Sequence, residues 1–355
     1  MYPCVEISKK LLRHNTQTVI ELCKPFGIKP AGVTKAFLAD PNIAGIMVDS
    51  GITVLADSRV ENLKRLQELP AEKLLLRIPM LSQCDDIVNT ADLCLVSELV
   101  TIKALNDSAE KNDKIIGIIL MVDLGDLREG IFDKEELYAT VQEALAMNHV
   151  ALKGIGTNLS CYGGVLPSQE NMEQLCSLAG NIEQRFNIKL DIISGGNSGT
   201  ISLFAKKNLP ARINQIRLGA SIACGIGLND KPIEPLSTNV FTLVLEIIEL
   251  KYKPSIPMGE RGLDAFGNLP EFEDKGIRLR AICAIGRQDI DPDNISPQES
   301  GIDVLGASSD HLILDVTDFN ERSPLKIGDH LRFNLSYGGV LSVMTSPFVS
   351  KLFIE

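Results

Sequence analysis

The chain has 355 residues, of which 45% are hydrophobic and 23% are charged, as in an ordinary globular protein with room for one large domain and a smaller one. Its formal net charge of -11 at pH 7 argues against nucleic acid or an anionic membrane surface as a partner, because both are bound through clustered Lys and Arg. The first fifteen residues resemble neither a signal peptide nor an anchor, and the longest apolar run, residues 115–122, is far shorter than the roughly 20 residues of a membrane helix. We therefore expect a soluble protein.

The eight cysteines form no CxxC pair and have no histidine at zinc-finger spacing, so we expect no metal site. Most of them lie in apolar surroundings, as Cys94 does between Leu93 and Leu95, where a free thiol behaves as a small hydrophobic group. Reduced thiols of this kind indicate a cytoplasmic protein.

Short apolar runs alternate with helical periods along the first two thirds of the chain. The runs are residues 30–37, 52–56, 73–78, 92–96, 114–122, 150–157, 189–193 and 213–218. Amphipathic periods predict helices at residues 8–27, 58–69, 98–110, 134–147 and 168–186. Alternating strands and helices indicate a parallel sheet, and eight units over about 220 residues favour an α/β fold of the closed (β/α)8 TIM barrel type.

Beyond Pro235 the pattern changes to strand-like runs separated by turns rich in Gly, Pro and Asp. These runs are residues 241–251, 277–285, 311–317 and 330–336. We therefore expect a barrel at residues 1–236 and a mainly β domain at residues 237–355.

Candidate site residues lie where the predicted barrel strands end. The active site of such a barrel is at the carboxyl ends of its strands, and phosphate is often bound by the loops after strands seven and eight. These loops, residues 194–200 and 218–221, are rich in Gly and Ser, so that N–H groups and hydroxyls can approach an anion. Lys35 ends the first strand, although a lysine there most often just reaches solvent. Arg128 alone suggests a surface ion pair, whereas Arg217, inside an apolar strand, needs a partner if buried.

From Lys35 through Arg217 the chain resembles the barrel of the alanine racemase-type, fold type III enzymes that use pyridoxal 5′-phosphate (PLP), and the β domain resembles their second domain. The resemblance covers nearly the whole chain, and its motifs are specific in combination. The motifs closest to the ornithine racemase-like branch are Val33-Thr34-Lys35, Gly195-Gly196-Asn197-Ser198-Gly199, Ser309-Asp310-His311 and Tyr337-Gly338-Gly339.

The resemblance implies a role for each of these residues. Lys35 would be the Schiff-base lysine, Arg217 would meet the pyridine nitrogen, and Arg128 would face the phenolic oxygen of PLP or the substrate carboxylate. The other cofactor-binding residues that it implies are Asn158, Asn197, Ser198, Gly219, Ala220 and, from the β domain, Tyr337. It also implies a homodimer with shared active sites, in which the β domain of one chain covers the barrel of the other.

The family tyrosine that serves as second base has no clear counterpart in residues 259–267. We expect the β domain to supply another group near the substrate Cα, and the candidates are Asp264, Asp310, His311 and Tyr337. Tyr337 fits the phosphate better than Cα, and we favour Asp264 and Asp310 as the catalytic residues. Both could also bind substrate, as could His311. Each has a plainer explanation, because Asp264 could shape a turn, Asp310 could cap one and His311 could be a core residue.

An acidic site suits a substrate with a side-chain ammonium, since an unpaired buried carboxylate is costly. We therefore predict a PLP-dependent racemase that interconverts the enantiomers of ornithine or another basic amino acid. Alanine remains an alternative substrate, and a PLP-dependent lyase or decarboxylase and a noncatalytic PLP carrier remain alternative functions. Arg217 counts against decarboxylation, because a guanidinium can only donate to the ring nitrogen and leaves it a weaker electron sink.

Overall fold

The computed structural model describes residues 1–205 and 208–355. They form two compact units, one of residues 9–238 and one that joins residues 1–8 to residues 239–355. The first eight residues, expected in the barrel, instead belong to the β unit. Their strand β1 (Cys4–Ser8) pairs with β10 (Phe241–Pro254) and with β16 (Ser350–Ile354).

The first unit is a closed barrel of eight strands, which confirms the predicted fold class. Its strands are β2 (Lys29–Val33), β3 (Val54–Asp57), β4 (Glu72–Leu75), β5 (Leu93–Val96), β6 (Ile116–Met121), β7 (Val150–Thr157), β8 (Ile192–Asn197) and β9 (Gln215–Leu218). Every neighbouring pair is parallel, and β9 closes the barrel on β2. Apolar side chains such as Val33, Leu74 and Ile119 fill the interior, so the barrel is a packed core.

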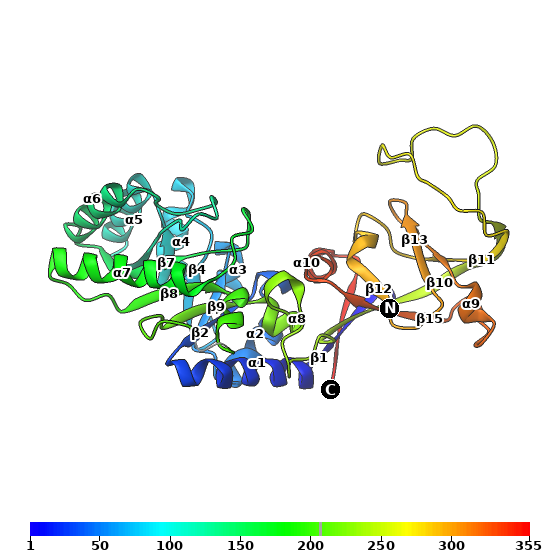
Figure 1. The fold of residues 1–355 in the computed structure, drawn as a ribbon, viewed down its shortest axis with the longest axis horizontal. Helices are drawn as coiled ribbons and strands as arrows, with labels where there is room; N and C mark the ends of the chain where they lie inside the picture. The colour runs from blue at the N-terminus through cyan, green and yellow to red at the C-terminus, as the bar shows by residue number, and fades with distance from the viewer. Residues whose placement is uncertain (206–207) are drawn as a thin grey trace. The chain divides into compact units, whose positions relative to one another are not determined.

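Helices cover the outside of this barrel (Figure 1). They are α1 (Lys9–Cys23), α2 (Pro41–Asp49), α3 (Val60–Arg65), α4 (Cys84–Thr90), α5 (Leu99–Lys111), α6 (Lys134–Leu145), α7 (Gln169–Phe186) and α8 (Ala220–Cys224). Ser168 begins α7 with a capping box, in which its side chain and that of Asn171 satisfy each other's backbone N–H groups. No helix among the described residues is long and apolar enough to cross a membrane.

The second unit is an eight-stranded, mainly antiparallel sheet. Its other elements are β11 (Ile277–Cys283), β12 (Ile295–Pro297), β13 (Asp303–Ala307), β14 (Leu312–Asp315), β15 (His330–Leu335), α9 (Thr317–Asn320) and α10 (Tyr337–Thr345). Between β10 and β11, residues 255–276 leave the sheet as a long open loop without helix or strand (Figure 1).

Candidate active site

Lys35 lies just beyond the carboxyl end of β2, in a single 3-10 turn. The strand ends at Val33, earlier than expected. Thr34 is buried and fixes this edge, because its hydroxyl donates to Asp57 Oδ2 at 2.7 Å and its N–H donates to the Ala56 carbonyl at 2.9 Å. The side chain of Lys35 is exposed and makes no hydrogen bond or ion pair with any described barrel residue. A rigid strand end thus presents an amine that is free to react.

A β-bulge between β8 and β9 shapes the first of the two Gly- and Ser-rich segments. Ser194 pairs with Gln215, but Asn197 pairs with Arg217, so β8 carries one extra residue there. Gly196 has φ +101°, and an added Cβ would lie 2.9 Å from Thr200 Oγ1. Residues 194–197, expected in a loop, are therefore a bulged strand end that turns the following residues toward the rim.

Hydroxyl groups from both predicted phosphate loops meet at this rim. Ser198 Oγ lies 3.1 Å from Ser221 Oγ and also accepts the Ser221 backbone N–H at 3.2 Å. Gly219 directly precedes α8, whose first residue is Ala220. The first N–H groups of a helix have no intrahelical acceptor, so this corner gathers donors suited to an anion.

Asn158 and Asn197 are joined by a hydrogen bond, with Asn197 Nδ2 donating to Asn158 Oδ1 at 3.1 Å. Asn197 Nδ2 also donates to the Leu159 carbonyl at 2.8 Å, and its Oδ1 accepts the Gly199 N–H at 2.9 Å. The thiol of Cys161 lies 3.1 Å from Asn158 Nδ2. The ends of β7 and β8 are therefore locked together by amide side chains.

Asp126 holds the loop after β7, although no motif in the sequence singles this residue out. Its Oδ1 accepts the N–H groups of Ser160 and Val165, and its Oδ2 accepts those of Cys161 and Tyr162, all at 3.0–3.1 Å. Burial raises the pKa of this carboxyl, but the four N–H donors together lower it by more, so the net pKa is below its ordinary value. The charged carboxylate is thus the form that organises the loop.

Arg128 pairs with the adjacent Glu129. Its Nε and Nη2 both donate to the carboxylate, the latter at 2.6 Å, while Nη1 is left for other acceptors. Burial lowers the pKa of Arg128, but its bonds to Glu129 raise it by more, to above its ordinary value. The sequence alone predicted this ion pair. The Arg128 side chain nevertheless stays partly exposed at the carboxyl end of the barrel strands, so its guanidinium remains accessible to a ligand.

Arg217 is buried inside the barrel, and among the described residues its side chain bonds neutral acceptors alone. Its Nη2 donates to the Thr157 carbonyl at 2.6 Å, and its Nη1 donates to Ser194 Oγ. Burial lowers the pKa of Arg217 to about 10, and the more distant Glu129 opposes this shift. The guanidinium therefore keeps a positive charge that no contacting carboxylate neutralises.

The candidate residues of the β unit lie in two loops. Asp264 Oδ1 accepts the N–H groups of Phe266 and Asn268 at 2.9 and 2.8 Å, so this carboxylate does shape a turn. Those N–H bonds, with a smaller contribution from the charge of Arg287, lower the pKa of Asp264 despite the opposing effect of desolvation. Arg287 also lies 5.0 Å from the centre of the Phe266 ring, which anchors the long loop to the sheet.

Asp310 and His311 lie together in the turn between β13 and β14. Asp310 Oδ1 lies 2.9 Å from His311 Nδ1, and this bond lowers the pKa of Asp310. Both side chains are exposed, so His311 is not a core residue. Tyr337 is the first residue of α10, which Ser336 caps by accepting the Gly339 N–H at 3.1 Å.

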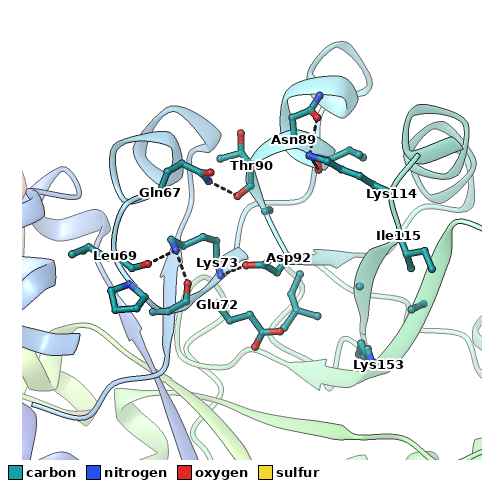
Figure 2. Close-up of a pocket in the computed structure, with 17 residues that line it drawn as sticks. Gln67, Leu69, Glu72, Lys73, Asn89, Thr90, Asp92, Lys114, Ile115 and Lys153 are labelled. Atoms are coloured by element: carbon teal, nitrogen blue, oxygen red, sulfur yellow. Dashed lines mark hydrogen bonds between the residues drawn. The ribbon is translucent and has the colours of Figure 1, made fainter. Parts of the chain in front are cut away.

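A cavity of about 630 Å³ lies at the amino ends of β4 to β7, away from the carboxyl ends that carry Lys35 (Figure 2). In it Lys73 Nζ donates to the carbonyls of Leu69 and Ala71 at 2.9 and 2.5 Å, and the Lys73 N–H donates to Asp92 at 2.7 Å. Burial lowers the pKa of this lysine, and Asp92 opposes the shift. Two backbone carbonyls therefore bind the ammonium of Lys73, so this lysine has a structural role.

The fold and the carboxyl edge of the barrel together define a class of protein. It is a barrel enzyme with a second β domain, and its barrel edge carries a free lysine, an anion-binding corner and a buried arginine. Residues 7–225 match the model of the alanine racemase N-terminal domain. An ornithine racemase of Acetoanaerobium sticklandii is 44% identical over 352 residues, with 99% of each chain covered. A lysine racemase of Thermotoga maritima is 39% identical over 356 residues, again with 99% of each chain covered.

Solved structures agree on the fold. Alanine racemase from Bartonella henselae with covalently bound pyridoxal phosphate has a TM-score of 0.75 at 19% identity, with 99% of each chain covered. The chain belongs to the alanine racemase family, and it is a PLP-dependent amino-acid racemase.

The residues at the carboxyl edge fit PLP. Lys35 offers an amine without a partner in the described barrel, and Ser198 and Ser221 offer hydroxyls at a helix start for the phosphate. Arg217 offers a charged donor for the ring nitrogen. The chemistry of these donors matches an aldehyde that carries a phosphate and a basic ring nitrogen.

Proposed function

We propose that this chain interconverts the L and D enantiomers of a basic amino acid and prefers ornithine over lysine and alanine. The observation that carries the proposal is the 44% identity to an ornithine racemase along 99% of both chains. The second relative, at 39%, is a racemase named for lysine, which also ends in an ammonium. The shared substrate class is therefore a basic side chain.

Bound PLP supplies the electron withdrawal that makes the Cα proton of an amino acid acidic. We assign to Lys35 the covalent hold on PLP and the movement of the Cα proton on one face, because its amine is exposed and unpaired in the described barrel. Arg217 can only donate, so a ring nitrogen bound beside it would have to accept and would stay unprotonated. This arrangement suits the removal and return of one proton better than decarboxylation.

The remaining barrel residues bind and orient. Ser198 would donate to the phosphate together with the backbone of Gly219 and Ala220, while Asn197 and Asn158 hold that loop in place. The phosphate donors would be completed by Tyr337 of a β unit.

Arg128 has Nη1 available after its pairing with Glu129. We assign this nitrogen to the substrate carboxylate or to the phenolic oxygen of PLP. Either acceptor suits a guanidinium that remains charged at any pH at which the enzyme works.

For the group that acts from the β unit, we favour Asp310 over Asp264. The turn uses one oxygen of Asp264 for the N–H groups of Phe266 and Asn268, so this carboxylate already has a structural role. Asp310 is exposed and, among the residues that the structure describes, its side chain pairs with His311 and two serine hydroxyls alone, so it can turn to a substrate ammonium.

We also propose a homodimer in which the β unit of each chain completes the barrel site of the other. The support is the long loop between β10 and β11, which exposes Met258, Leu263 and Leu269 at 88%, 70% and 61%. Apolar side chains gathered on one loop are typical of a surface that is buried on association. A second copy of the chain is the partner that the family supplies.

We place the protein in the cytoplasm, because all eight of its cysteines are unpaired and six are buried.

The test is chiral chromatography of an amino-acid panel after incubation with purified protein and PLP. We expect D-ornithine from L-ornithine at a higher kcat/KM than for lysine, and little turnover of alanine. A preference for alanine over ornithine, or release of a decarboxylated amine, would refute the proposal.

A further inference from the structure

A chain of three buried polar side chains crosses the interior of the barrel beneath the cofactor edge. Gln215 and Arg217 are two residues apart on β9, and Ser194 lies opposite them on β8. Ser194 Oγ donates to Gln215 Oε1 at 2.9 Å, and Arg217 Nη1 donates to Ser194 Oγ. Their exposed fractions are 0% for Ser194 and 5% for Gln215 and Arg217, so water does not compete for these bonds.

The direction of these bonds depends on Gln215. A serine hydroxyl has a single proton and two lone pairs. Because Gln215 Oε1 accepts that proton, the lone pairs of Ser194 remain for the N–H of Arg217. Without an acceptor at position 215, the hydroxyl could rotate its proton toward the guanidinium, and a buried donor would face a buried donor.

The groups that hold Arg217 are also uncharged. Arg217 contacts a hydroxyl and the carbonyl of Thr157, and the next group along, Gln215, is an uncharged amide. Glu129, the acidic residue that most raises the pKa of Arg217, is itself paired with Arg128. A carboxylate in this chain would hold the guanidinium equally well but would cancel its charge.

We propose that Gln215 is a positioning residue of the racemase: through Ser194 it holds Arg217 by a neutral relay, so that the whole positive charge of Arg217 acts on the ring nitrogen of PLP. This inference rests on the proposed role of Arg217. It assigns a function to two interior residues that touch neither the substrate nor the cofactor in the account above.

The test uses Gln215→Glu, which keeps the shape and the acceptor but adds a negative charge. The readout is the ¹⁵N NMR signal of the ring nitrogen of labelled PLP bound to the protein without substrate. We expect the wild-type signal to be that of an unprotonated nitrogen and the Gln215→Glu signal to move toward the protonated form. We expect kcat to fall about tenfold or more while KM changes less than about threefold, as for an interaction made in the transition state.

Two further variants keep the relay testable if Gln215→Glu folds poorly. Ser194→Ala removes the acceptor of Arg217 Nη1 and should weaken PLP binding by the apoprotein, whereas Ser194→Thr keeps the hydroxyl and should restore it. Gln67→Glu is the charge-matched control, because Gln67 bonds the Thr90 carbonyl in the cavity at the opposite end of the barrel.

An unchanged ¹⁵N signal and unchanged kcat in Gln215→Glu would overturn the relay, as would the same change in Gln67→Glu. Equal PLP affinity in Ser194→Ala and wild type would also overturn it. Failure of the proposed function is separate, because it would show as a wild-type protein that racemises no basic amino acid whatever its ¹⁵N signal.

Discussion

Replacement of Asp126 by Asn should release the loop after β7 while the barrel stays folded. The four N–H groups that Asp126 binds are divided between its two oxygens. Asn retains one oxygen, and its NH2 group then faces two of the four donors. A fully buried donor left without an acceptor costs about 1–3 kcal/mol, and because these N–H groups are only partly buried we expect a loss near the lower end for two donors, about 2 kcal/mol.

This cost should appear as local opening, because Tyr162 at the loop tip is 76% exposed and the loop can open into water. Hydrogen exchange followed by mass spectrometry measures it directly. A loss of 2 kcal/mol corresponds to about 30-fold faster exchange at residues 160–165, since about 1.4 kcal/mol is a factor of ten. We expect turnover to fall as well, because the same loop carries Asn158 toward Asn197.

The matched control is Asp123→Asn. Asp123 accepts the N–H groups of Gly125 and Leu127 on a single oxygen, at 2.8 and 3.2 Å, and Asn keeps that oxygen. Exchange at residues 160–165 should therefore stay at the wild-type rate in this variant. Unchanged exchange of these amides in Asp126→Asn, or equal acceleration in Asp123→Asn, would show that the Asp126 carboxylate does not hold this loop.

The pKa of Asp126 is lower in the folded state than its ordinary 3.8. Hydrogen-exchange protection of its loop should therefore be full above pH 3.8 and should be lost as the pH falls through the lower folded pKa. Loss of protection that begins near pH 6 would contradict this. Lys35→Ala should lose the covalent link to PLP and essentially all turnover, while Lys73→Ala keeps both; borohydride reduction and peptide mass spectrometry would reveal attachment at any other lysine. Asp310→Asn should lower kcat/KM for ornithine about 100-fold or more, as expected when a charged partner is left unpaired. Asp264→Asn should have less effect, and neither variant should change PLP affinity much. Equal turnover in both variants would remove the assignment of Asp310. Mixing inactive Lys35→Ala and Asp310→Asn chains should restore some activity if sites are shared, and an active monomer in sedimentation would exclude a shared site.

The barrel could be predicted because strands buried on both faces read as continuous apolar runs, as at Leu93–Val96 and Ile116–Met121. The position of Lys35 and the two Gly- and Ser-rich segments followed from the order of those runs. The strand Cys4–Ser8 could not be assigned in the same way. Its partners lie more than 230 residues away, and no local pattern encodes that pairing.

A site residue could be predicted only where its residue type is unusual for its place in the sequence pattern. Arg217 stands out because a charge inside an apolar strand requires an explanation. Asp126 does not stand out, because its role in holding the loop depends on N–H groups that lie 34 to 39 residues further along the chain. Ser194 and Gln215 were also missed. Ser194 precedes two glycines, a pattern that predicts a loop, and only the β-bulge in the structure explains why it lies inside the barrel.

Racemisation by Lys35 is tested by the fate of the Cα proton of L-ornithine in D2O, followed by ¹H NMR in the presence of the enzyme and PLP. We expect the Cα proton to be replaced by deuterium while every carbon is retained, D-ornithine to accumulate to an equal amount, and Lys35→Ala to show neither change. Loss of the carboxyl carbon, an unexchanged Cα proton, or full exchange with Lys35→Ala would contradict it.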